Sequence, residues 1–327
     1  MRHSTGVDSR TRPLYKGRSL LSPKALLLVP LAIVGLAFIA FWAWNFRKAR
    51  VAGRRDDPAA DARAPTLLQI AIGAVTDFFD TLGVGSFATT TPIFRFTKMV
   101  PDRLIPGTLN VGHALPTFVE AAVYTQIIEV NFTTLVLMIA AAVAGAWLGA
   151  GVVARLPKQK IQVGMGMALL AAAALLVARV TKLLPAGGTA VELSGGLLAV
   201  GLVGNFIFGA LMTIGIGAYA PIMILVSMLG MDPTTAFPIM MGSCAFLMPI
   251  ASTQFVRHGA YALRPALGLA LGGMPAVLAA AFIVKSMSLD TVRILVVLVV
   301  GYTAVTLLRA AAREQVGGKS EDAPGPA

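Results

Sequence analysis

The sequence predicts an all-α polytopic membrane protein, built from two homologous helical repeats with glycine-broken helices and one extra N-terminal transmembrane helix. Three observations support this class. Of the 327 residues, 57% are hydrophobic and only 13% are charged, with a mean hydropathy of +0.79, whereas a soluble domain carries roughly 25% charged residues. The apolar residues form long uncharged runs. A glycine motif recurs in the second half of the chain.

The chain begins with a basic tail, residues 1–24, and continues with an uncharged run, Ala25–Phe46. A membrane-spanning helix needs about 20 apolar residues. This run is longer than the apolar segment of a usual signal peptide, and no small-residue cleavage motif follows it. We therefore expect an uncleaved transmembrane helix, followed by a charged linker over residues 47–65.

Ten further apolar runs follow the linker. They are Thr66–Leu82, Gly83–Thr97, Leu109–Ile128, Thr133–Ala154, Ile161–Thr181, Leu193–Ile214, Gly215–Leu229, Thr234–Val256, Pro265–Val284 and Leu289–Leu308. Most are too long for the strands of a membrane β-barrel, which need about ten alternating residues. The polar tail 313–327 is predicted to be disordered.

The two halves of the membrane region repeat one order of features. The Gly-x-Gly pair at residues 83–85 recurs 132 positions later, at residues 215–217, and each pair precedes a polar turn and three long runs. We therefore interpret residues 66–182 and 193–312 as two transporter repeats, because repeats with interrupted helices at matching places are typical of secondary transporters.

The net charge of +12 comes from Lys and Arg in the tails and in short connections between apolar runs. This placement is typical of cytoplasmic loops, and the basic tails suit anionic lipid head groups. It argues against a nucleic-acid partner and predicts a multi-pass protein of a bacterial inner membrane. The charges favour inverted repeats with five crossings each, although the basic N-terminal tail then falls outside. A parallel arrangement of four crossings each stays open.

Breaks at the glycine pairs would leave backbone N–H groups unpaired inside the membrane, and such groups need a cavity or a ligand. A half-helix N-terminus carries partial positive charge and suits an anion. The alternative is that nearby hydroxyls bond carbonyls of their own helix. The candidate residues for binding the solute are Gly83, Gly85, Ser86, Thr89, Thr90, Asn205, Thr213, Gly215 and Gly217.

Four ionisable residues interrupt otherwise apolar runs: Asp77, Asp80, His113 and Glu120. Charges are costly inside a bilayer and are usually functional there. Asp77 and Asp80 share a helix face, as do His113 and Glu120. We expect them to carry protons or a coupling ion. The alternative is that the carboxylates are solvated or cap the next half-helix, and that the histidine bonds backbone at a kink.

The stretch of residues 83–92 resembles the G-x-G-G-G-x-x-x-x-P motif of the sulfite exporter TauE/SafE family. Gly83, Gly85 and Pro92 fall on that spacing, whereas Ser86 and Phe87 replace two glycines. The resemblance extends over about residues 66–312. It implies a membrane permease of two related halves that moves sulfite, sulfonates or other small organic anions.

Together these observations predict a secondary transporter for a small anion, coupled to an ion gradient, with a passive channel as the alternative. A membrane-embedded enzyme is less favoured, because no known catalytic spacing joins the Ser, His and carboxylate residues. No cofactor and no metal site are predicted from one cysteine, Cys244, and three histidines. The sequence does not predict the oligomeric state.

Overall fold

The computed structural model describes residues 23–51, 58–61, 63–153, 158–181, 183, 188–212 and 218–321. Within these residues every regular element is a helix, and the β-type pairing is a single isolated bridge between Ala190 and Met231. The all-α class is therefore confirmed. The basic tail up to residue 22 lies outside the described residues.

The long helices follow the predicted runs in order. They are α1 (Pro23–Val51), α2 (Leu67–Thr81), α3 (Ser86–Thr97), α4 (Ile105–Ile127), α5 (Phe132–Val153), α6 (Lys158–Val180), α7 (Gly195–Met212), α8 (Tyr219–Met228), α9 (Ala236–Arg257), α10 (Leu263–Ser286) and α11 (Leu289–Glu321). Short 3₁₀ turns, η1 (Pro58–Ala60), η2 (Asp102–Leu104) and η3 (Pro233–Thr235), precede α2, α4 and α9.

Five segments of the described chain are long and apolar enough to cross a membrane. They are Lys24–Lys48, Gly195–Met212, Pro233–Arg257, Leu263–Ser286 and Asp290–Ala312. Large apolar side chains on the outer helix surfaces are exposed, with 67% of Leu36, 80% of Trp147 and 64% of Phe282 accessible. Such a surface suits lipid, whereas polar side chains are buried inside the bundle.

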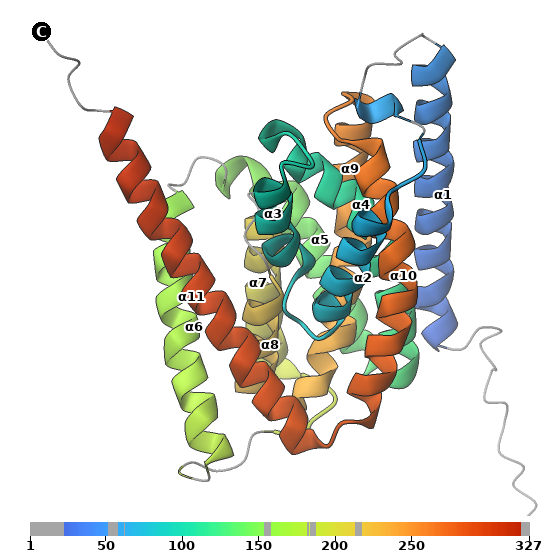
Figure 1. Cartoon of the computed structure of the whole chain (residues 1–327). Helices are drawn as coiled ribbons and strands as arrows, with labels where there is room; N and C mark the ends of the chain where they lie inside the picture. Colours follow the sequence, from blue (N-terminus) through green and yellow to red (C-terminus); the bar gives the residue numbers. More distant parts are fainter. Residues whose placement is uncertain are drawn as a thin grey trace, which may run out of the picture.

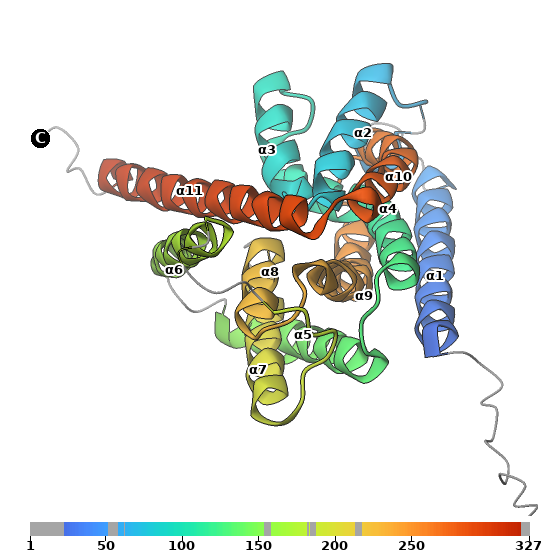
Figure 2. The ribbon, with the colours of Figure 1, turned by 90° about the horizontal axis from the view of Figure 1, so that it is seen from below.

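Two long helices, α4 and α9, pack against each other near the centre of the bundle. The pair α2 and α10 packs on one side of them, and the pair α5 and α7 packs on the other (Figure 2). Helix α1 lies at one edge, and α6 with α11 forms a pair at the opposite edge (Figure 1).

Glycines allow the pairs α2–α10 and α5–α7 to approach closely. A Cβ atom on Gly73 or Gly272 would collide with the backbone of the opposite helix at Leu269 or Ile70. Gly209 of α7 likewise meets the Ala142 backbone of α5. Because lipid gives no hydrophobic drive to join helices, small residues that permit dense packing stabilise such pairs.

The chain reverses direction between α2 and α3. Helix α2 begins with a capping box, in which Gln69 N donates to Thr66 Oγ1 (3.3 Å) and Thr66 N donates to Gln69 Oε1 (2.8 Å). It ends before Gly83 (φ +95°), and α3 starts after Gly85 (φ +88°). These left-handed conformations favour glycine. The predicted break at residues 83–85 is therefore present, and it forms the tip of a hairpin inside the bundle (Figure 1).

The connections at both ends are more ordered than expected. Trp42 Nε1 donates to Tyr261 Oη (3.0 Å), which in turn contacts the Ala59 carbonyl (3.4 Å), and Arg264 Nε donates to the Ala64 carbonyl (2.8 Å). Part of the predicted linker 47–65 is helical, in the last turn of α1 and in η1, and its carbonyls at Ala59 and Ala64 contact the α9–α10 connection and the start of α10. Helix α11 continues to Glu321, and the disorder of the tail 313–327 stays a prediction.

Candidate functional site

Three helices meet at a buried chain of hydrogen bonds. His113 of α4 places Nδ1 2.7 Å from Asp77 Oδ1 of α2 and Nε2 3.1 Å from Thr90 Oγ1 of α3. All three side chains are fully buried. The Phe87 ring lies 6.0 Å from the imidazole ring. Two of the predicted ionisable residues and one predicted hydroxyl are thus brought into one site.

The side chain of Asp80, which belongs to α2, lies at the N-terminus of α3. Its Oδ1 accepts a hydrogen bond from the backbone N–H of Ser86 (2.8 Å), and its side chain is buried. The positive end of this half-helix, which the sequence assigned to a solute anion, therefore holds a carboxylate of the protein itself. This arrangement corresponds to the capping alternative, and it puts Asp80 in the place that an anion would need.

Glu120 joins the same region through Thr81. The Thr81 hydroxyl lies 2.8 Å from Glu120 Oε1 and 2.7 Å from the Asp77 carbonyl, and Tyr124 donates to the Thr81 carbonyl (2.7 Å). The sequence interpretation missed Thr81 and Tyr124. Tyr124 follows Glu120 by four residues on α4, so the helix period was the signal that pointed to it.

The cluster of Asp77, Asp80 and Glu120 has more acceptors than donors. One oxygen of each carboxyl group has no hydrogen-bond partner among the described residues. The three groups lie within electrostatic range of one another, and the buried side chains of the described chain include no Lys or Arg. Because uncompensated buried carboxylates are costly, this site favours bound protons or an added ligand. No trio of His, Cys, Asp or Glu in the described chain is arranged to hold a metal ion.

The second half of the chain covers this cluster with aromatic and sulfur-containing residues. Tyr219 at the start of α8 and Cys244 of α9 both interact electrostatically with Asp80 and Glu120. Met223 Sδ would lie 3.0 Å from a Cβ on Gly83. The tip of the α2–α3 hairpin is therefore packed against α8 and α9.

The other predicted solute ligands have different surroundings. Thr89 donates to the Ser86 carbonyl of its own helix (2.9 Å), as the alternative interpretation proposed. Asn205 is buried and donates to the Met138 carbonyl of α5 (2.6 Å), so it ties α7 to α5. A Cβ on Gly85 would meet no atom within 4 Å. The predicted residues Thr213, Gly215 and Gly217 lie outside the described residues.

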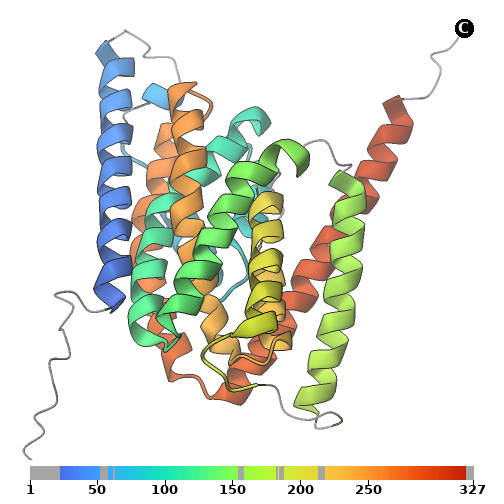
Figure 3. The ribbon, with the colours of Figure 1, turned by 180° about the vertical axis from the view of Figure 1, so that it is seen from behind.

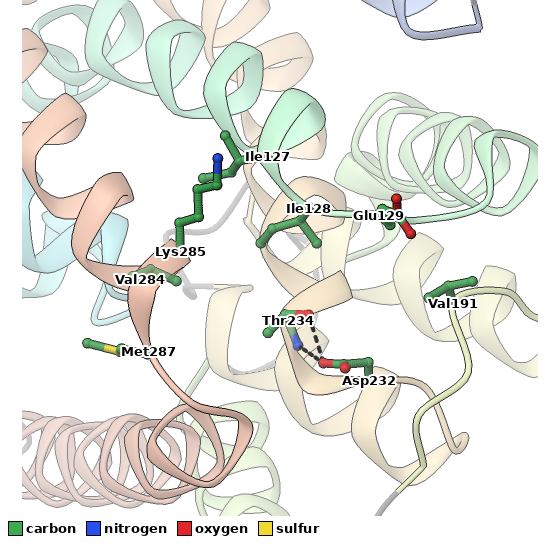
Figure 4. A pocket seen from close by; sticks show the side chains of 9 residues that line it. All are labelled: Ile127, Ile128, Glu129, Val191, Asp232, Thr234, Val284, Lys285 and Met287. Carbon is green, nitrogen blue, oxygen red and sulfur yellow. Dashed lines mark hydrogen bonds between the residues drawn. The ribbon is translucent and has the colours of Figure 1, made fainter.

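A cavity of about 310 Å³ opens at one end of the bundle, near the end of α4 (Figure 4). Side chains from α4, α10 and four connecting segments line it: Ile127, Ile128, Glu129, Val191, Asp232, Thr234, Val284, Lys285 and Met287. Asp232 Oδ1 accepts hydrogen bonds from the backbone N–H (2.8 Å) and the hydroxyl (2.7 Å) of Thr234, which orders this wall (Figure 4).

Residues 18–176, just under half of the chain, match the sulfite exporter TauE/SafE family, which confirms the resemblance carried by residues 83–92. The match includes α1, which the sequence interpretation placed outside the resemblance, and it ends within α6. No curated protein and no solved structure gives a match. The matched family and the apolar helices support a multi-pass membrane transporter.

Proposed function

Because residues 18–176 match the TauE/SafE transporters, we propose that this protein is a secondary transporter that moves a small anion, such as sulfite, a sulfonate or an organic acid, across the bacterial inner membrane together with protons. The observation that carries this proposal is the cluster of three buried carboxyl groups and one imidazole, with no buried Lys or Arg among the residues that the structure describes.

Charge repulsion explains why anion binding at this cluster requires bound protons. Two like charges 4 Å apart repel by about 4 kcal/mol at an effective dielectric constant of 20. An anion therefore enters beside Asp77, Asp80 and Glu120 only when protons neutralise part of the cluster. Proton binding and anion binding are then favourable together, which is the thermodynamic basis of symport.

The hydroxyl of Thr81 supports a protonated Glu120. It has one proton but two close oxygens, the Asp77 carbonyl at 2.7 Å and Glu120 Oε1 at 2.8 Å. The carbonyl can only accept. If Thr81 donates to that carbonyl, the short contact with Glu120 is satisfied when the carboxyl group is protonated and donates to Thr81.

Asp80 supplies a coupling step. As a carboxylate it makes a charge-assisted hydrogen bond with Ser86 N–H, which is roughly twice as strong as a neutral one. Protonation weakens this bond and frees the N-terminus of α3 for the solute anion. The open space beside Gly85 adjoins this position. In this proposal, the anion and the proton of Asp80 enter and leave as a pair.

The helix order supports alternating access by two inverted repeats. Helices α4, α5 and α6 begin at residues 105, 132 and 158, and α9, α10 and α11 begin 131 residues later in each case. The α2–α3 hairpin enters from one end of the bundle, and α7 with α8 enters from the other (Figures 1 and 3). Inverted repeats of this kind exchange two conformations around a central site.

The distribution of basic residues indicates which end of the bundle faces the cytoplasm. The end of the bundle where α1 finishes carries a group of basic residues: Arg47, Lys48, Arg63, Arg95, Lys98, Arg103, Arg257, Arg264 and Arg309. The opposite end has fewer basic residues in the described chain, namely Lys24, Arg179, Lys285 and Arg293, together with acidic residues such as Glu129 and Asp232. By the positive-inside rule the first end faces the cytoplasm.

The test is Asp80→Asn in proteoliposomes, with uptake of labelled sulfite, sulfonates and small carboxylates measured with and without a pH gradient. Asn keeps an oxygen for Ser86 N–H but takes up no proton, so gradient-driven accumulation should fall at least tenfold. Met212→Leu, 132 positions later on α7, is the matched control and should retain accumulation.

Normal accumulation by the folded Asp80→Asn protein would contradict the coupling role. If the unaltered protein shows equal downhill flux with and without the gradient, the protein is a passive channel and the coupled-carrier proposal fails.

A further inference from the structure

The residues that line the cavity of Figure 4 lie close along the chain to a stacked pair of aromatic residues on α4 and α9. Tyr124 of α4 and Phe237 of α9 stack with ring centroids 5.0 Å apart and an interplanar angle of 20°. Both are fully buried. Ile128, in the cavity wall, donates its N–H to the Tyr124 carbonyl (3.0 Å), and Thr234 of the opposite wall precedes Phe237 by three residues. One helical turn therefore separates the cavity from the rings.

The acidic cluster lies on the other side of this pair. Glu120 lies one turn before Tyr124 on α4, away from the cavity end of the helix, and the Tyr124 hydroxyl donates to the Thr81 carbonyl (2.7 Å). The Thr81 hydroxyl contacts Glu120 (2.8 Å). A series of contacts thus leads from the cavity wall through Tyr124, which stacks on Phe237, and Thr81 to a carboxyl group of the cluster. Movement of the Tyr124 ring breaks a hydrogen bond at the end of α2, the helix that carries Asp77 and Asp80.

We propose that this cavity is the vestibule through which the solute enters or leaves, and that the Tyr124–Phe237 stack is the closed barrier between the vestibule and the acidic cluster. This inference rests on the proposed transport function. Helices α4 and α9 carry one ring each, so a small shift of these two helices relative to each other separates the rings. The Tyr124–Thr81 hydrogen bond then links the barrier to the protonation of Glu120.

The native cysteine provides a reporter behind the barrier. Cys244 is buried and lies seven residues, or about 10 Å, beyond Phe237 along α9. An impermeant thiol reagent in the vestibule should reach it only when the rings no longer block the way. Labelling requires no transport, so its outcome is independent of the flux measurements on Asp80→Asn.

The experiment uses the full chain in oriented proteoliposomes and 2-sulfonatoethyl methanethiosulfonate as the reagent. Ile128→Cys in a Cys244→Ala background first shows which face opens into the cavity. Reagent added to that face should label Cys244 at least tenfold faster in Tyr124→Ala and in Phe237→Ala than in the unaltered protein. Tyr124→Phe keeps the stacked ring and should label as slowly as the unaltered protein.

Both alanine variants are checked for a wild-type elution profile in detergent before labelling, and Phe237→Leu and Tyr124→Leu replace any variant that does not fold. Unchanged Cys244 labelling in folded variants at both ring positions would overturn the barrier. Faster labelling only from the opposite face, or an equal increase in Tyr124→Phe, would also overturn it.

Discussion

The two halves of the bundle place different chemistry at matching positions. In the first half, Asp77 contacts Gly273 of α10 and binds His113 of α4. At the corresponding places, 132 and 131 residues later, Gly209 lies against Ala142 and Cys244 replaces the histidine.

Asp80 likewise corresponds to Met212, whose Sδ lies 3.8 Å from Cys244 Sγ. The second half therefore builds a similar helix frame with small and sulfur-containing side chains. Because the frame does not need carboxylates, their burial in the first half points to a chemical role rather than a structural one.

The largest expected effect concerns the close packing of α10 against Asp77. A Cβ on Gly273 would collide with Asp77 Oδ2 and with Pro116 Cγ, so Gly273→Leu should destabilise the fold by about 3 kcal/mol or more. We expect little monodisperse protein in detergent chromatography. Gly164→Leu on α6 is the control, because no atom lies within 4 Å of its added Cβ. A well-folded Gly273→Leu protein would show that α10 does not seal the cluster.

The second prediction compares transport by variants at matching positions of the two halves. His113→Gln removes the imidazole that bridges Asp77 and Thr90, and a glutamine takes up no proton. Accumulation under a pH gradient should fall at least tenfold. Cys244→Ala, at the matching position on α9, should change accumulation by less than twofold. Similar losses of accumulation in both variants would mean that both halves contribute equally to transport, and would contradict a specific role for the acidic cluster.

The smallest expected effect concerns Thr81, which joins Asp77 to Glu120. Thr81→Val keeps the side-chain shape but removes the hydroxyl, and the loss of such a buried hydrogen bond costs about 1–3 kcal/mol. The thermal midpoint in detergent should fall, and the pH dependence of uptake should change. Thr76→Val is the control, because the Thr76 hydroxyl bonds only the carbonyls of Ile72 and Gly73 in its own helix. Equal changes in both variants would indicate that Thr81 acts only on helix stability.

Most helices were predictable because lipid imposes a simple rule on length and charge. A helix that crosses lipid must satisfy its own backbone and expose apolar side chains, so the runs of residues 133–154 and 265–284 closely match α5 and α10. The break at residues 83–85 was also predictable, because Gly83 and Gly85 adopt a positive φ at little energetic cost. The polar composition after residue 312 is typical of disorder, although α11 extends to Glu321.

For the candidate site, the sequence by itself determined that Asp77, Asp80, His113 and Glu120 interrupt apolar helices, and that a glycine break follows the first two. Only the tertiary structure decided that these groups share one cluster, that Asp80 caps α3, and that Asn205 ties α7 to α5 instead. The physical reason is that periodicity fixes which residues share a helix face, whereas the contacts between helices depend on how closely small residues such as Gly273 allow them to pack.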